Sequence, residues 1–172
     1  TEKGVRVGGK VYEVDAIVFA TGFDAMTGAL LDIDIRGRGG RALKEKWADV
    51  PRNYLGLTVA DFPNMFTITG PGSPSVFTNM LPAIEQHVDW VTDCLAYMRK
   101  RNLNSIEASA EAEAAWVAHV AEVGAVSLRS HCDSWYLGAN IAGKPRAFAP
   151  YIGGVPVYAQ KCDEIAAHGY EG

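Results

Sequence analysis

The most informative segment of this sequence is Met65-Phe66-Thr67-Ile68-Thr69-Gly70-Pro71-Gly72-Ser73-Pro74-Ser75. Residues 65–69 form a short apolar and β-branched run, which is typical of a buried strand. Residues 70–75 form a loop of glycine, proline and serine, and a helical pattern follows the loop. The order strand, glycine loop, helix is how α/β folds bring backbone N–H groups to a nucleotide. This segment therefore favours an α/β fold with a nucleotide site.

Three helices are predicted downstream of this loop. The first has Pro82 near its first turn, where a missing N–H has no cost, and ends at Arg99-Lys100-Arg101, where cations suit the helix dipole. Its apolar residues share one stripe, which we expect to face the core: Ile84, Val88, Val91, Leu95 and Met98. The second helix covers Ser109–Val123, with Trp116, Val120 and Val123 on one side, and the third covers Val157–His168.

The segment before residue 25 also has the pattern of strands. Val5–Val7, the Gly8-Gly9 turn and Val11–Val14 predict a hairpin. Ala16–Ala20 is a continuous apolar run, which predicts a second strand buried on both faces, and it ends in a tight turn at Thr21-Gly22. Strands that alternate with helices again indicate the α/β class.

Composition excludes several classes of protein. The 172 residues contain 16 Lys+Arg and 20 Asp+Glu, so the formal net charge is −4, and 48% of the residues are hydrophobic. This apolar content argues against a disordered chain, and the net charge argues against a nucleic-acid partner bound through a broad basic surface. No apolar run approaches the roughly 20 residues that span a bilayer. No signal or transit peptide is evident either, so we expect no membrane partner and a cytoplasmic location.

Motifs of the common catalytic and metal sites are absent from the sequence. It contains no G-x-S-x-G, H-E-x-x-H, P-loop or G-x-G-x-x-G pattern. Cys94, Cys132 and Cys162 are widely spaced and form no CxxC pair, so we expect inert thiols and no metal site. Nucleotide-type loops without a dinucleotide fingerprint predict part of a larger binding unit.

Four features have both a functional and a structural interpretation. The turn at 20–24 either ends a strand or lies beside a nucleotide, and the N–H groups of residues 70–80 either bind an anion or ring carbonyl or form an ordinary turn. Trp135 is either a core residue or a stacking surface. Lys144 and Arg146 are either solvated charges or phosphate contacts.

In these same segments the sequence resembles the C-terminal third of flavin-dependent Baeyer–Villiger monooxygenases, in particular the phenylacetone, cyclohexanone and steroid monooxygenase group. The resemblance covers essentially the whole chain, and its motifs are highly specific in combination. The matching stretches are Asp15-Ala16-Ile17-Val18-Phe19-Ala20-Thr21-Gly22-Phe23-Asp24, Pro63-Asn64-Met65-Phe66, Gly70-Pro71-Gly72-Ser73-Pro74-Ser75, Asn79-Met80, Glu85-Gln86-His87-Val88-Asp89-Trp90, Ser134-Trp135-Tyr136-Leu137-Gly138-Ala139-Asn140-Ile141 and Gly143-Lys144-Pro145-Arg146.

The resemblance implies an FAD- and NADPH-dependent monooxygenase that inserts one oxygen atom of O2 next to a ketone carbonyl and gives an ester or lactone. The flavin carries the chemistry, and the protein positions it and excludes water. By the family pattern, the backbone N–H of Met80 lies near a carbonyl of the flavin ring. The residues that match the lining of the ketone pocket are Ser75, Val76 and Phe77.

The resemblance also implies a domain organisation, in which residues 1–22 end the NADP-binding domain and include the crossover strand. Residues 23–172 then form the C-terminal portion of the FAD-binding domain, with an incomplete Rossmann-type sheet and a mobile loop at about 132–150. Trp135 matches the tryptophan of that loop, which folds over NADP. The residues that match the turn between the two domains are Thr21, Gly22 and Asp24.

Both dinucleotide fingerprints and the catalytic arginine of the family match nothing in this chain. We therefore expect no catalytic residue in this segment, no activity from the 172 residues alone, and a missing N-terminal portion of the same enzyme as the partner. Ala142 also stands where many members have proline. Two alternatives remain: an N- or S-oxidising flavin monooxygenase that shares the turn at 20–24, and a truncated, non-catalytic binding or scaffold protein.

Overall fold

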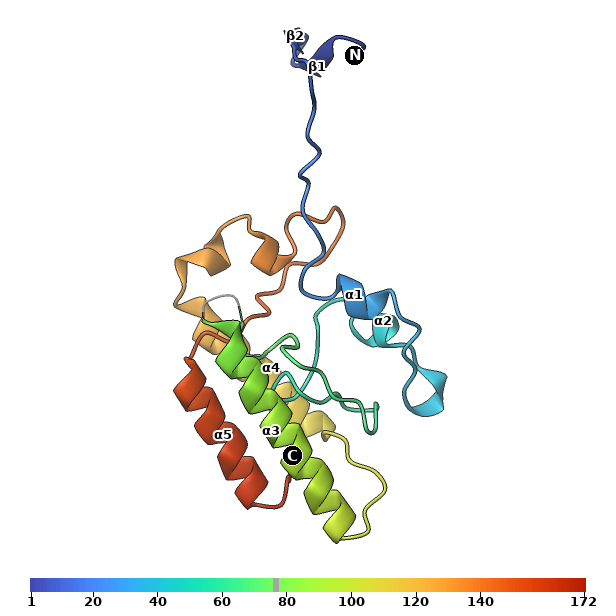
Figure 1. The fold of residues 1–172 in the computed structure, drawn as a ribbon, viewed down its shortest axis with the longest axis vertical. Helices are drawn as coiled ribbons and strands as arrows, with labels where there is room; N and C mark the ends of the chain where they lie inside the picture. Colours follow the sequence, from blue (N-terminus) through green and yellow to red (C-terminus); the bar gives the residue numbers. More distant parts are fainter. Residues whose placement is uncertain (76–77) are drawn as a thin grey trace.

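Three helices form the body of the protein in the computed structural model, which describes residues 1–75 and 78–172 (Figure 1). They are α3 (Met80–Lys100), α4 (Ala110–Ala125) and α5 (Val155–Ala167), and α3 packs against α5. Each begins and ends within a few residues of its predicted bounds, so the three helix predictions are confirmed. Val76 and Phe77, two of the predicted pocket residues, lie outside the described residues.

The other elements are short. The predicted hairpin is confirmed as β1 (Gly4–Val7) and β2 (Lys10–Glu13), which pair antiparallel. The short helices are α1 (Gly28–Leu31), η1 (Arg38–Gly40), α2 (Leu43–Lys46), η2 (Leu128–His131) and η3 (Trp135–Leu137). None of the helices in the described ranges is long and apolar enough to cross a bilayer.

Helix α3 is buried along a different stripe from the one predicted. Its N-terminus is capped by Asn79, whose side chain accepts the N–H of Leu81 at 3.1 Å. Val88 and Leu95, two of the predicted core residues, are 46% and 48% exposed. The residues that α3 buries are Ala83, His87, Trp90, Cys94 and Met98. Met98 belongs to both the predicted and the buried stripe. Each of the other buried residues lies one position before a residue of the predicted stripe.

Hydrogen bonds explain this rotation of α3. The Trp90 indole N–H donates to the carbonyl of Cys162 on α5 at 2.9 Å, and His87 Nδ1 accepts the N–H of Thr69 at 3.0 Å. Each ring is thus buried with one polar atom hydrogen-bonded, which lowers the cost of its burial, although His87 Nε2 has no partner among the described residues.

The core has two parts. The larger one lies among the three long helices and the buried segment 55–60, where the Tyr158 hydroxyl donates to the carbonyl of Leu55 at 2.7 Å. Trp116 and Val120 are buried in it and Val123 packs against it, as their side of α4 predicts. The smaller part lies beside α2 and consists of Leu43, Trp47, Val59 and Phe62.

Neither segment that was predicted as a single strand is paired as a strand within the described residues. Residues 65–69 are buried or half-buried apart from the exposed Ile68, and they form no strand, because left-handed backbone at Asn64 (φ 60°) and Thr69 (φ 54°) bends both ends of the segment. Residues 16–20 run as extended chain away from the helical body, and Val18 and Phe19 are 85% and 84% exposed (Figure 1). A strand needs a partner, and within the described residues β1 and β2 pair only with each other, so no Rossmann-type sheet is formed there.

Candidate functional site

The structure brings together two of the segments predicted to contact a nucleotide, the turn at 21–24 and the loop that carries Trp135. Lys144 Nζ donates to the carboxylate of Asp24 and, at 2.6 Å, to the hydroxyl of the buried Thr27. Asn140 Nδ2 donates to the carbonyl of Phe23 at 3.0 Å. These contacts join residues 117 to 120 positions apart in the sequence and hold the loop against the turn.

A cavity of about 330 Å³ lies where the two segments meet. Thr21, Gly22, Trp135 and Asn140 line it, so it contains three of the predicted cofactor residues. Its volume is at the low end of the range for small-molecule sites. The indole of Trp135 is 39% exposed and provides an aromatic surface on which a planar ring could stack. We call this space the Trp135 cavity.

Local sequence explains how Trp135 comes to face outward. The Ser134 hydroxyl accepts the N–H of Tyr136 at 3.3 Å and so caps η3, and Leu137 is buried and anchors the turn. Gly138 has φ 73° and ends η3 in a left-handed conformation that a residue with a side chain rarely adopts. With Leu137 held inside, Trp135 at the other end of this single turn remains accessible.

Lys144 and Arg146 are both paired with carboxylates of the protein itself. Arg146 pairs with Asp133 on the surface, where both side chains are more than half exposed. Lys144 and Asp24 are 20% and 29% exposed, so water screens their ion pair less. The tethering role of Lys144 was missed from the sequence, because no local pattern connects it to a residue 120 positions away.

We expect Lys144→Met to release this loop from the turn. A charge-assisted hydrogen bond contributes about 1.5–3 kcal/mol, so chymotrypsin cleavage after Trp135 or Tyr136 should become roughly tenfold faster. Arg146→Met, which breaks only an exposed ion pair, is the matched control and should change the cleavage rate little. Equal cleavage rates for the two variants would show that Lys144 does not hold the loop.

The loop at 70–75 is packed in the interior, and its N–H groups serve the protein itself. The N–H of Gly72 donates to the carbonyl of Ala149 at 2.7 Å, and the N–H of Ser73 donates to the carbonyl of Gly70 at 3.1 Å. The Trp116 indole N–H donates to the carbonyl of Gly72 at 3.0 Å. The structural interpretation is therefore supported for Gly72 and Ser73, whose N–H groups are already used within the protein.

The predicted flavin and ketone residues lie on either side of positions 76 and 77. Ser75 is 6% exposed, and no described residue hydrogen-bonds its hydroxyl. Met80 is the first residue of α3 and is 36% exposed. It is not part of the lining of the Trp135 cavity, so the structure does not gather all of the predicted site residues in one place.

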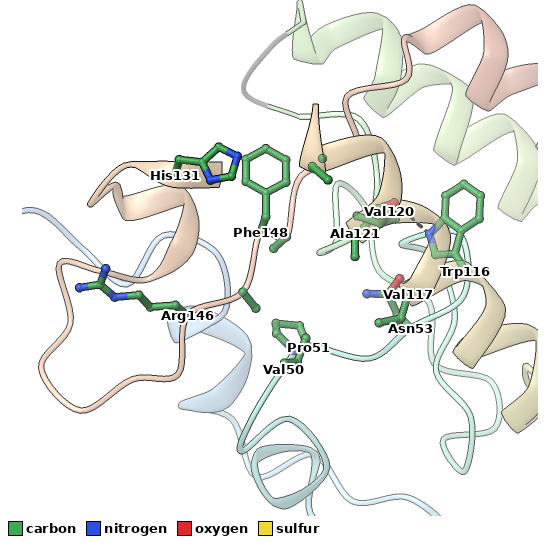
Figure 2. Close-up of a pocket in the computed structure, with 15 residues that line it drawn as sticks. Val50, Pro51, Asn53, Trp116, Val117, Val120, Ala121, His131, Arg146 and Phe148 are labelled. Atoms are coloured by element: carbon green, nitrogen blue, oxygen red, sulfur yellow. Dashed lines mark hydrogen bonds between the residues drawn. The ribbon is translucent and has the colours of Figure 1, made fainter. Parts of the chain in front are cut away.

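A second and larger cavity, of about 490 Å³, was not predicted from the sequence (Figure 2). It lies between the second half of α4 and residues 50–53, and residues 146–149 close another side. Its walls come from segments far apart in the sequence, and only Gly72 and Arg146 among its lining residues belong to the stretches that carry the family resemblance. It shares no lining residue with the Trp135 cavity.

Burial shifts the pKa of two cysteines and one histidine away from the range in which these side chains react or exchange protons near neutral pH. It raises the pKa of the Cys94 and Cys162 thiols to about 11, so both remain protonated and unreactive near neutral pH. It lowers the pKa of His87 to about 4, so this imidazole stays neutral. In the part of the chain that the structure describes, no three His, Cys, Asp or Glu side chains gather around a possible metal position.

His87 should make the folded state sensitive to acid. Its pKa of about 4 in the folded state lies below the ordinary value of 6.5, so the unfolded chain binds a proton first as the pH falls. Stability should be complete above pH 6.5 and decrease by about 3 kcal/mol as the pH falls to 4. The check is urea denaturation at pH 7.5, 5.5 and 4.5 for the protein and for His87→Gln. A parallel pH dependence in both would contradict the assignment.

Curated relatives match the chain over almost its full length. It is 44% identical over 99% of its length to acetone monooxygenase (methyl acetate-forming) of Gordonia sp. (strain TY-5). It is 40% identical over its full length to cyclohexanone 1,2-monooxygenase of Acinetobacter sp. and also to phenazine N-monooxygenase of Lysobacter antibioticus. The chain spans only 32%, 32% and 30% of these three proteins. No family model matches the chain.

Solved structures agree with the sequence relatives. Oxidised steroid monooxygenase bound to NADP superposes with a TM-score of 0.87 and 50% identity, over 99% of this chain and 32% of that one. A complex of OTEMO with FAD and NADP superposes with a TM-score of 0.89 and 33% identity, over all of this chain and 32% of that one. The described fold is therefore that of about one third of an FAD- and NADP-binding flavoprotein.

Proposed function

This chain is a homologue of a segment of the flavin-dependent Baeyer–Villiger monooxygenases, and from that relationship we propose that it forms part of an FAD- and NADPH-dependent monooxygenase. The proposed reaction inserts one oxygen atom of O2 next to a ketone carbonyl and gives an ester or lactone. The observation that carries the proposal is the Trp135 cavity, where Trp135 and the turn at 21–24 are held together by the Asp24–Lys144 ion pair.

The Trp135 cavity suits one planar ring of NADP better than the whole dinucleotide. Its aromatic wall can stack with such a ring, but the chain has no G-x-G-x-x-G loop to hold the diphosphate. We therefore assign the loop at about 132–150 the role of covering NADP through Trp135. Thr21, Gly22 and Asp24 form the turn against which this loop closes.

On the flavin side, Met80 is proposed to present its backbone N–H to the ring, and Ser75 to line the ketone pocket together with Val76 and Phe77. A buried hydroxyl with no partner among the described residues supports this for Ser75, because such a group normally has one. Bound flavin supplies the oxygen chemistry, and the residues of this chain orient the ligands and exclude water. The reacting protein groups are proposed to lie outside this chain, which by itself is then inactive.

The exposure of residues 16–20 supports the proposed domain organisation. Exposed apolar runs of this kind commonly mark an interaction surface, and Ile17, Val18 and Phe19 are between 47% and 85% exposed. We propose that this segment is the crossover strand of a Rossmann-type sheet whose other strands belong to the remainder of the enzyme. Residues 1–22 would then end the NADP-binding domain, and residues 23–172 would belong to the FAD-binding domain.

The test is an assay of the complete enzyme that carries this chain, after its length has been established by intact mass spectrometry. We expect a yellow protein that oxidises NADPH only when a ketone and O2 are present, with the ester or lactone identified by mass spectrometry. A colourless protein, or NADPH oxidation that does not depend on the ketone, would contradict the proposal and favour the non-catalytic alternative.

N-oxidation is the second candidate function. It is supported by the 40% identity with a phenazine N-monooxygenase, which equals the identity with a cyclohexanone monooxygenase. The two functions separate in one experiment, in which a ketone and an aromatic N-heterocycle compete for the same enzyme. Ester formation supports the first function, and exclusive N-oxide formation supports the second.

A further inference from the structure

The larger cavity has the size and the wall of a binding site, and none of the proposed cofactor or ketone residues lines it (Figure 2). Its volume of about 490 Å³ lies within the range of small-molecule sites. Val50 and Pro51 form one side, and Val117, Val120 and Phe148 form much of the rest (Figure 2). Apolar walls of this kind favour a ligand with little charge.

Charged groups contribute little to the interior of this cavity. The guanidinium of Arg146 points away from it and pairs with Asp133 (Figure 2). The indole N–H of Trp116 is already bonded to the carbonyl of Gly72. Apart from Arg146 and the His131 imidazole, no ionisable side chain among the described residues lines the cavity, so a charged ligand would lose its hydration for little compensation.

Asn53 provides a hydrogen-bond donor in this apolar wall. The residue is 2% exposed, and its Oδ1 accepts the N–H of Gly56 at 2.8 Å. A backbone N–H can only donate, so this contact fixes which end of the amide is oxygen. The amide nitrogen is then turned toward the cavity (Figure 2). No described residue accepts a hydrogen bond from this nitrogen, so it can donate to a ligand in the cavity.

Gly72 makes room for this arrangement. A Cβ atom at position 72 would lie 2.7 Å from Asn53 Oδ1 and 3.2 Å from Trp116 Nε1. A side chain there would displace both groups, so the glycine preserves the position of the Asn53 amide at the cavity wall.

We propose that this cavity binds a small, uncharged, mainly apolar molecule through one carbonyl oxygen, which accepts a hydrogen bond from Asn53 Nδ2. The site itself follows from the cavity and the orientation of Asn53. That its occupant is a ketone or an ester rests on the proposed function, because these are the substrate and product classes of that reaction.

The location of the ligand is tested with crystals of the complete enzyme soaked in 4-bromocyclohexanone, whose bromine gives an anomalous signal. We expect a peak between α4 and Phe148, with the ketone oxygen near Asn53 Nδ2. Ala121→Phe fills the cavity and should abolish this peak. Ala115→Phe, at an exposed alanine of the same helix that does not line the cavity, should keep it. A bromine peak found only outside this cavity would overturn the proposal.

The role of the carbonyl is tested in solution by NMR titration of the oxidised enzyme, which does not turn over. Cyclohexanone and ε-caprolactone distinguish substrate from product, and methylenecyclohexane has nearly the same shape without the oxygen. A hydrogen bond should make cyclohexanone bind about fivefold more tightly than methylenecyclohexane, and Asn53→Leu should remove that difference. Equal affinities in the unmodified enzyme would contradict the role of Asn53.

Ala121→Phe keeps the Asn53–Gly56 contact, so it remains informative if Asn53→Leu does not fold. The experiments also distinguish a failure of the proposed ligand site from a failure of the proposed monooxygenase function. A bromine peak at Asn53 in an enzyme without ketone-dependent NADPH oxidation supports the site and contradicts the monooxygenase function. Full activity with no ligand in the cavity contradicts the site alone.

Discussion

Glu113→Ala is expected to destabilise the folded protein by about 3–5 kcal/mol, because it leaves the buried Lys46 ammonium with only the exposed Asp61 carboxylate, 4.0 Å away, as a counter-charge. Glu113 lies on α4 with its side chain 3% exposed, and Lys46, from α2, is 6% exposed. One carboxylate oxygen lies 2.9 Å from Lys46 Nζ, and the other accepts the N–H of Ala60 at 3.0 Å. The substitution therefore breaks the link between α4 and the smaller core.

Urea denaturation followed by tryptophan fluorescence measures this loss. Glu111→Ala, at an exposed position of the same helix, is the matched control and should change stability by less than about 0.5 kcal/mol. Adding Lys46→Met to Glu113→Leu should recover part of the loss, because an apolar pair can replace a buried ion pair. If Glu113→Ala changes stability as little as Glu111→Ala does, the ion pair does not hold α4 in place.

Trp135→Ala is expected to raise the KM for NADPH at least about tenfold in the complete enzyme, while the FAD content stays unchanged. Stacking of a base on an aromatic side chain contributes about 1–3 kcal/mol, and the indole is the aromatic wall of the Trp135 cavity. Steady-state kinetics at saturating ketone, with flavin absorbance per protein, separates the two effects.

Trp135→Phe is the informative control, because it keeps an aromatic face at the same position. It should retain most of the NADPH affinity that the alanine variant loses. An unchanged KM in Trp135→Ala would remove Trp135 from the coenzyme site. A parallel loss of FAD in that variant would instead indicate a general defect in folding.

Local sequence patterns predicted the helices well and the strands poorly. A helix satisfies its own backbone, so Pro82 near the first turn, the apolar period and the basic C-terminal end of α3 were enough to predict it. A single strand depends on a neighbour that its own residues do not encode, and residues 16–20 have none in the described structure. The hairpin was predictable because both of its strands and its turn are adjacent in the sequence.

The candidate site was predictable only in its local parts. The turn at 21–24 and Trp135 each stand out in the sequence, but their meeting depends on Lys144, which is far from Asp24 in the chain. The buried stripe of α3 was misjudged because hydropathy alone ignores the hydrogen bonds of His87 and Trp90. No sequence pattern predicted the larger cavity, because Asn53 resembles any other loop asparagine until its neighbours in the fold are known.

The projecting segment at 16–20 has a practical consequence for work with this polypeptide. Val18 and Phe19 point to opposite faces of an extended backbone, so both faces expose apolar side chains. The backbone N–H and C=O groups at its edges can then pair with another chain. Concentrated samples of the 172-residue chain would then join copy to copy through this segment, as unprotected β edges do. A charged substitution at Val18 is a simple way to keep such samples dispersed.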